Sequence, residues 1–116
     1  MAITRVESLI YGVTDIDLGI RYFENWGLEK IEKNINGAIF KTPTNQTIHI
    51  LSKDNPSLPP APDDENSTVR QTIWGVKTPT DIEKIGAEMS IDREVQYNPD
   101  GSIQVTDECG FCIGFC

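Results

Sequence analysis

The sequence predicts an α+β fold in which two tandem βαβββ modules form an eight-stranded, half-open barrel around a concave pocket. Three observations predict this fold. The strand-to-helix junction I-Y-G-V-T-D-I-D at 10–17 recurs as I-W-G-V-K-T-P-T-D-I-E at 73–83. The turn and strand N-G-A-I-F-K-T at 36–42 has its counterpart in D-G-S-I-Q-V-T at 100–106. Corresponding residues are 63 to 66 positions apart, so one supersecondary unit is written twice, and two copies side by side would enclose a hollow.

The first module begins with a strand over Val6–Val13, a short segment rich in β-branched and aromatic residues. Thr14 then opens T-D-I-D, a side-chain cap followed three residues later by a carboxylate. Apolar residues follow with the spacing of one helix face: Ile16, Ile20 and Phe23. Gly27 is expected to end the helix. Three more strands are expected at 28–33, 38–41 and 47–51, the first two joined by an Asn-Gly turn.

The segment 55–66, N-P-S-L-P-P-A-P-D-D-E-N, separates the modules. Its four prolines lack backbone donors and favour an extended chain, so we expect a linker over the surface that ends in a solvated acidic run. In the second module we expect a strand at 69–76, a helix that begins with a capping box of Thr80 and Glu83, and strands at 94–97, 102–105 and 111–115. The apolar stripe of that helix is Ile82, Ile85 and Met89.

The chain is therefore expected to form a single domain over 1–116, with module one at 1–54, the proline-rich linker at 55–66 and module two at 67–116. It stops at Cys116, inside a segment that resembles a strand. We accordingly expect it to be a fragment of a longer protein.

Composition excludes several function classes. Ten Lys and Arg stand against eighteen Asp and Glu, a formal charge of -8, and such a chain repels nucleic-acid phosphates. No apolar run approaches the roughly 20 residues of a membrane span, and the N-terminus M-A-I-T-R-V-E-S has no apolar signal-peptide region. All three cysteines lie in the last eight residues, which argues against a disulfide framework and for the reducing cytoplasm.

Short motifs in order support a family resemblance over essentially all 116 residues: G-V-T-D, R-Y-F-E and W-G-L in module one, and the closing D-E-C-G-F-C-I-G at 107–114. With these motifs the chain resembles the vicinal oxygen chelate superfamily of glyoxalases, bleomycin-resistance proteins and extradiol dioxygenases. The resemblance implies a pocket in which four inward-pointing side chains, two per module, hold a divalent metal. Carried onto this sequence, those positions are Ser8, His49, Gln71 and Gly114.

These four residues depart from the His and Glu that the family uses. A catalytic mononuclear site needs about three strong protein ligands, and only His49 is one. We therefore expect no metal cofactor in this chain, with Fe²⁺, Mn²⁺ or Zn²⁺ as the alternative.

Strand alternation assigns the faces of the expected sheet. It puts Ile48 and Ile50 toward the core and His49 on the opposite, concave face. His49 is the single catalytic candidate, since its reference pKa is near neutrality, although it could equally be a polar residue on a wet sheet face. The residues expected to line the pocket beside the family positions are Ile10, Gly12, Leu51, Ile73, Gly75 and Cys112. The glycines among them would clear space for a ligand or relieve strand curvature.

The other candidates favour structural roles. The cysteines could form a zinc site with His49, but C-x-x-C is strong evidence only when a second such motif is present, so small buried thiols are favoured for Cys109, Cys112 and Cys116. Tyr11 and Trp74 are expected on the helix-facing side, in the core. No spacing indicates a nucleophile with its base or a phosphate-binding loop.

Three functions remain open. The chain could be the non-catalytic amino-terminal half of an extradiol-dioxygenase-like protein. It could be a stand-alone, dimeric protein that binds a small molecule such as a cationic aromatic antibiotic. It could also be a metal-independent lyase or isomerase that uses His49. All three take a small-molecule ligand, and the partner would be a second copy or a second domain of the same protein.

Overall fold

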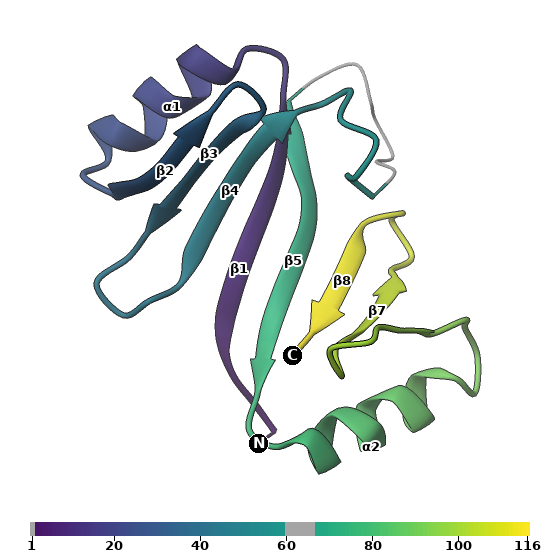
Figure 1. Ribbon diagram of the computed structural model, residues 1–116. Helices are drawn as coiled ribbons and strands as arrows, with labels where there is room; N and C mark the ends of the chain where they lie inside the picture. The colour runs from purple at the N-terminus through teal and green to yellow at the C-terminus, as the bar shows by residue number, and fades with distance from the viewer. Residues whose placement is uncertain (1, 60–66) are drawn as a thin grey trace.

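Two long central strands organise the molecule. The computed structural model describes residues 2–59 and 67–116, and in it β1 (Ile3–Val13) pairs antiparallel with β5 (Thr68–Val76) through the middle of the sheet (Figure 1). Each of these strands begins one module, so the seam between the modules is a direct strand pair rather than a loose contact between domains.

The first module continues from β1 into α1 (Ile16–Asn25), β2 (Glu29–Asn34), β3 (Gly37–Lys41) and β4 (Thr47–Ser52). The last strand returns to pair with β1 in parallel. The second module repeats the plan with α2 (Pro79–Met89), β6 (Gln96–Tyr97), β7 (Ile103–Thr106) and β8 (Cys112–Phe115), and β8 pairs with β5 in parallel.

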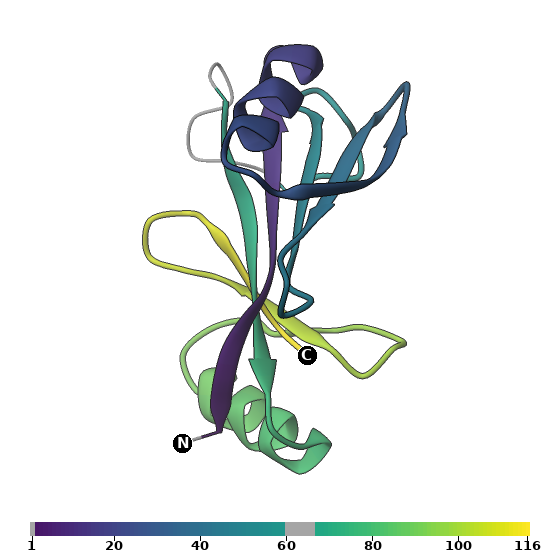
Figure 2. The same cartoon turned by 90° about the vertical axis from the view of Figure 1, so that its left-hand side faces the viewer.

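The strands form one eight-stranded sheet in the order β2-β3-β4-β1-β5-β8-β7-β6. From the central β1–β5 pair outward, the first strand of each module is followed by its fourth, third and second strands. The two modules are therefore related by a pseudo-twofold axis. The sheet is strongly twisted and open, with α1 and α2 at opposite ends of the molecule (Figure 2). This confirms the predicted α+β fold of paired βαβββ modules. None of the described helices is long and apolar enough to cross a membrane.

Each helix covers its own module and forms a separate apolar core. The first core holds the buried helix residues Ile20 and Phe23 against Phe40 and Ile50, whose side chains are 0% exposed. The second core joins α2 to Ile103, Val105 and Phe115. Tyr11 and Trp74 pack against these two clusters, as predicted from strand alternation.

Both predicted helix caps are wrong by one or two residues. In α1 the cap is Asp15, whose carboxylate accepts from the Leu18 backbone N–H at 3.1 Å. In α2 the cap is Thr78, whose hydroxyl oxygen accepts from the Asp81 N–H, and Pro79 occupies the first turn. Proline is favoured there because its fixed φ suits the helix and its missing N–H would have had no partner.

Several strand limits also differ from those predicted. β1 begins three residues earlier than Val6, because its first residues pair with the far end of β5. β6 is only Gln96–Tyr97, shorter than the expected 94–97, since it is an edge strand paired with β7 alone.

The seam between β1 and β5 contains two matching bulges. Glu7 is the extra residue of β1 between the pairs Val6–Trp74 and Ser8–Ile73. Arg70 is the extra residue of β5 between the pairs Ile10–Gln71 and Tyr11–Val69. The two extra residues are 63 positions apart, so the bulge belongs to the repeated unit. A bulge sharpens local twist and turns an additional side chain toward one face.

The first part of the linker packs into the protein, unlike the predicted surface linker. Leu58 is 9% exposed, and its Cδ1 would lie 3.1 Å from a β-carbon built on Gly12. The Arg70 guanidinium holds this segment by donating to the carbonyl oxygens of Lys53 (3.0 Å) and Pro59 (3.1 Å). Residues 53–59 are called the strap below. The acidic run at 63–65 lies outside the described residues.

Truncation of the first core tests this packing. We expect Phe40→Ala to lower the free energy of unfolding by about 3–5 kcal/mol, because the ring is fully buried and the cavity left behind cannot collapse completely. Chemical denaturation measures the change. The matched control is Ile91→Ala, at a residue 77% exposed, for which a change within about 0.5 kcal/mol is expected. Equal losses in the two variants would contradict the assigned core.

Candidate functional site

The four family positions occupy four neighbouring central strands. Ser8 lies on β1, His49 on β4, Gln71 on β5 and Gly114 on β8. In the sheet register, Ile10 of β1 has His49 beside it on one side and Gln71 on the other. Ile73 of β5 likewise has Ser8 and Gly114 as its neighbours. The four positions therefore surround the centre of the concave face, although they come from segments up to 106 residues apart.

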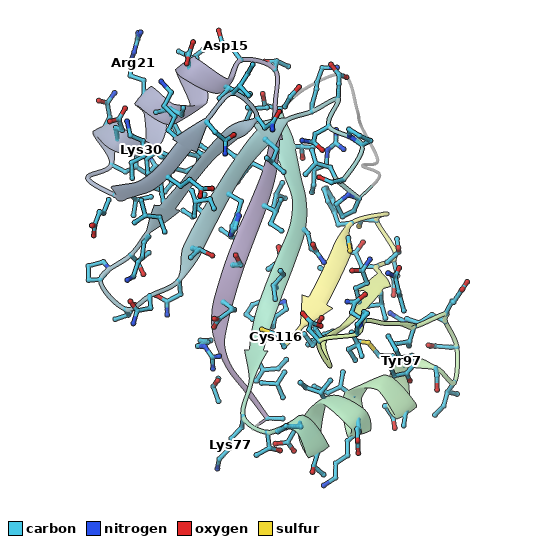
Figure 3. All side chains as sticks on the ribbon, in the orientation of Figure 1. Asp15, Arg21, Lys30, Lys77, Tyr97 and Cys116 are labelled. Atoms are coloured by element: carbon cyan, nitrogen blue, oxygen red, sulfur yellow. The ribbon has the colours of Figure 1, made fainter. Side chains whose placement is uncertain are left out.

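A cavity of about 270 Å³ opens beside three of these positions. Its wall includes Ser8, Gln71 and Gly114, and also Ile73, but not His49. The remaining lining residues come from the bulge of β1 and from module two: Glu7, Asn98, Asp100, Ser102, Ile103, Phe115 and Cys116. Figure 3 shows Cys116 at the end of β8, close to β5.

A chain of hydrogen bonds joins the cavity wall to the imidazole. The hydroxyl oxygens of Ser8 and Thr47 are 2.6 Å apart, and the Thr47 hydroxyl is 3.2 Å from His49 Nε2. Ser8 is buried, with 6% of its surface exposed. Because Thr47 and His49 are two residues apart on β4, strand alternation puts both side chains on the concave face.

His49 is a neutral imidazole at physiological pH. Partial burial lowers its pKa below the usual 6.5, and the nearby Glu32 carboxylate opposes this shift only in part. A neutral ring has one donor nitrogen and one acceptor nitrogen, so it can end a hydrogen-bond chain.

Amide side chains form a second chain on the module-two side. Gln71 Nε2 and Gln104 Oε1 are 3.5 Å apart, and Gln104 in turn donates to Gln96 Oε1 at 3.3 Å. Burial raises the pKa of the Cys112 thiol, while a hydrogen bond with Gln71 acts in the opposite direction. The thiol is thus kept protonated and is a poor nucleophile. Cys112 lines a second hollow of about 260 Å³ with residues of β6 and β7.

The two halves of the concave face are not equivalent. On the module-one side, the strap residue Leu58 and the Arg70 side chain cover Gly12. On the module-two side, Arg5 lies over Gly75, where an added β-carbon would be 2.5 Å from Arg5 Cζ, and Arg5 forms an ion pair with Glu7. No linker segment of the described residues fills this second half, and the 270 Å³ cavity lies there.

The residues at the family positions do not fit a catalytic metal. They offer one imidazole, one amide and one hydroxyl, and Gly114 has no side chain. His49 Nε2 is already within hydrogen-bonding distance of Thr47. Among residues 2–59 and 67–116, no group of three or more His, Cys, Asp or Glu side chains could hold an ion. No chemistry at this site can therefore be derived through a metal held by these groups.

The structure places the other predicted site residues as follows. Ile10 and Ile73 lie at the centre of the concave face, and Leu51 pairs with Gly12 beside the strap. Gly12 and Gly75 are covered by side chains rather than open to a ligand. The expectation of three buried thiols is wrong for Cys109 and Cys116, which are exposed, while Cys112 is buried.

Sequence reasoning missed several residues of the site. Strand alternation puts Thr47 on the same face as His49, but its contact with Ser8 depends on the β1–β4 register. Glu7 and Arg70 reach this face only because of the bulges. Asp100 was predicted only as part of a turn and Ser102 only as the start of a strand, although the Asp100 carboxylate accepts hydrogen bonds from Ser102 that lower its pKa.

Comparison with solved structures identifies the same fold in two kinds of enzyme. Homoprotocatechuate 2,3-dioxygenase from Brevibacterium fuscum, in a variant form, matches 98% of this chain with a TM-score of 0.74 and 17% identity, and the native enzyme from Arthrobacter globiformis matches equally well. A Mn(II)-bound glyoxalase from Novosphingobium aromaticivorans matches 98% of the chain with a TM-score of 0.69 and 16% identity. The predicted resemblance in fold to extradiol dioxygenases and glyoxalases is thereby confirmed.

This chain is much shorter than the proteins that it matches. It covers 32% of the Brevibacterium dioxygenase, 36% of the Arthrobacter dioxygenase and 38% of the glyoxalase. No protein-family profile and no curated protein sequence matches it. At these identities, the likeness establishes the fold and leaves function to the residues of the site.

The lowered pKa of His49 makes stability depend on pH. As pH falls, His49 takes up its proton first in the unfolded chain, and this favours unfolding. The stabilisation that neutral His49 gives the folded state is therefore complete above about pH 6.5, and it is lost as pH falls through the lower pKa of His49 in the folded state. We expect His49→Gln to flatten this part of the curve of unfolding free energy against pH. Urea denaturation at a series of pH values measures it, and identical curves for both proteins would contradict the burial of His49.

The cysteines should differ in reactivity. Cys109 is exposed, Cys116 is exposed with a pKa raised by partial burial, and Cys112 is buried with a raised pKa. Since the thiolate is the reactive form, we expect iodoacetamide to alkylate Cys109 first and Cys112 last, as followed by mass spectrometry. In denaturant the three rates should converge. Rapid modification of Cys112 in the folded protein would contradict its packing.

Proposed function

We propose that this chain is the non-catalytic amino-terminal half of an extradiol-dioxygenase-like protein, a module pair that holds a small molecule or a partner domain without a metal of its own. The observation that carries the proposal is the donor set at the four family positions, where only His49 is a strong metal ligand. The chain spans about a third of the length of the matched dioxygenases.

The proposal implies further properties of the whole protein. Catalysis would belong to a second pair of modules in the same polypeptide, and that pair would be the partner of this one. All three cysteines of the chain are free thiols, which supports a reducing, cytoplasmic location. In such a protein, the hollow of this half would serve binding or domain packing rather than turnover.

A second candidate function is a stand-alone protein that binds a cationic small molecule. The observation that favours it is the pair of carboxylates, Glu7 and Asp100, in the wall of the 270 Å³ cavity. Such a binding protein would be dimeric, as in the bleomycin-resistance type, and the formal charge of -8 would attract cationic ligands.

The metal-independent lyase or isomerase has less support. It requires His49 to reach a substrate, whereas His49 is separated from the cavity by Thr47 and Ser8. Any role of this imidazole in the cavity must pass through the two hydroxyl groups.

Restoring the ligands tests the proposed loss of the metal. We expect the wild-type domain to show no stoichiometric binding of Mn(II) by calorimetry. The variant Ser8→His/Gln71→His/Gly114→Glu, together with the native His49, should bind Mn(II) at least about tenfold more tightly, a difference of about 1.4 kcal/mol. The control is Ser8→His alone, which supplies too few ligands. Stoichiometric metal in the wild-type protein would overturn the proposal.

The gene distinguishes the first candidate from the second. The first requires a reading frame that continues beyond Cys116 into another module pair with His and Glu at the four positions. A stop codon directly after Cys116 would reject it and favour the stand-alone binding protein.

A further inference from the structure

We propose that Ser8, Thr47 and His49 form a hydroxyl relay that turns the Ser8 oxygen into a hydrogen-bond acceptor in the cavity wall, so that the cavity selects a ligand carrying an O–H or N–H donor. The inference rests on the proposed ligand-holding function and assigns a class of ligand to it. The carrying observation is the unbroken contact from the buried Ser8 hydroxyl through Thr47 to a ring nitrogen of the chain's single histidine.

The distances determine the direction of the relay. If Nε2 of His49 is the acceptor, then Thr47 donates to it and Ser8 donates to Thr47, so each proton lies in a contact of 2.6 or 3.2 Å. If Nε2 were the donor, only one of the two hydroxyl protons could lie in the 2.6 Å contact between Ser8 and Thr47. Either the Ser8 proton would have only the Thr47 carbonyl oxygen, 3.4 Å away, which is long for an O–H···O bond, or the Thr47 proton would lie in neither contact of the relay. A buried hydroxyl favours the first arrangement, because an unpaired donor costs free energy.

In that arrangement, Ser8 presents an acceptor to the cavity. Its single proton points toward Thr47 on β4, and its two lone pairs remain able to accept hydrogen bonds in the cavity wall, which Ser8 lines. Two of these groups, Glu7 and Asp100, are carboxylates and so also accept hydrogen bonds. These acceptors favour a ligand that supplies donors.

Protonation of the imidazole removes the acceptor that ends the relay. Both nitrogens of the charged ring donate, so Thr47 must accept from His49, while its second lone pair can still accept the Ser8 proton. The charged groups near this chain are Glu32 of β2, which interacts with His49, and Lys41 of β3, which pairs with Thr47. The neighbours paired directly with His49 are the uncharged Ile39 and Ile10. Beyond Ser8, the Arg5–Glu7 ion pair is internally neutralised.

The relay can be tested without a ligand, because the chain has one histidine and its imidazole signals are unambiguous. Long-range ¹H–¹⁵N correlation at pH 8 should show the neutral ring with its proton on Nδ1 and Nε2 as acceptor. In Thr47→Val, which keeps the shape and removes the hydroxyl, the Nε2–H form should rise at least about twofold in population. The matched control Thr106→Val changes a threonine at the end of β7 and should leave the ring unchanged. A wild-type ring with its proton on Nε2, unaltered by Thr47→Val, would overturn the relay.

Phenol and anisole, which differ by one O–H, test the ligand class. Amide shifts of Gly114 and Ser102 report binding in the cavity. At pH 8 we expect phenol to bind more tightly than anisole, and Ser8→Ala to weaken phenol by about tenfold while leaving anisole unchanged.

Equal affinities of phenol and anisole at pH 8 would overturn the ligand preference. If neither compound binds, the ligand-holding role of this cavity fails as well. The ring spectrum still decides whether the relay exists, so failure of the proposed function and failure of the relay give different results.

Discussion

The antiparallel pairing of β1 with β5 is the interaction on which the rest of the structure depends. It joins the modules, and each strand also carries the parallel return strand of its own module, β4 or β8. All four family positions lie on these four strands, so the geometry of the site is a consequence of the sheet register. The matching bulges at Glu7 and Arg70 add twist at this seam and direct two charged side chains to the concave face.

The two modules have diverged at the bulge, and this divergence explains why one half of the concave face is filled. Arg70 donates to two carbonyl oxygens of the strap and so fixes Leu58 over Gly12. Its counterpart Glu7 cannot donate and instead pairs with Arg5. Guanidinium and carboxylate at equivalent positions thus produce a closed half and an open half from one repeated backbone.

The repeat, the order of elements and the two sheet faces could be predicted from the sequence, because they follow from local periodicity. The bulges could not, since they arise only when strands about 60 residues apart in the sequence are paired. The contact between Ser8 and Thr47 could not be predicted either, because it depends on the β1–β4 register. Leu58 was misassigned to a surface linker because its neighbours are prolines, whereas its burial depends on distant Gly12 and Arg70.

Charge on the outer edge strand limits how a second copy could associate. An irregularity in β2 puts Lys30 and Lys33 on the helix side, opposite Phe40 and Ala38, whereas Glu29 and Glu32 lie on the concave side. If the β2 strands of two copies paired antiparallel about a twofold axis, the helix side of one strand would continue into the helix side of the other. The lysines of one copy would then lie beside the lysines of the other, and the glutamates beside the glutamates. Like charges across strands are destabilising, and charged edges with bulges are a known defence against sheet extension. The charges on β2 therefore disfavour a dimer that pairs the two β2 edges.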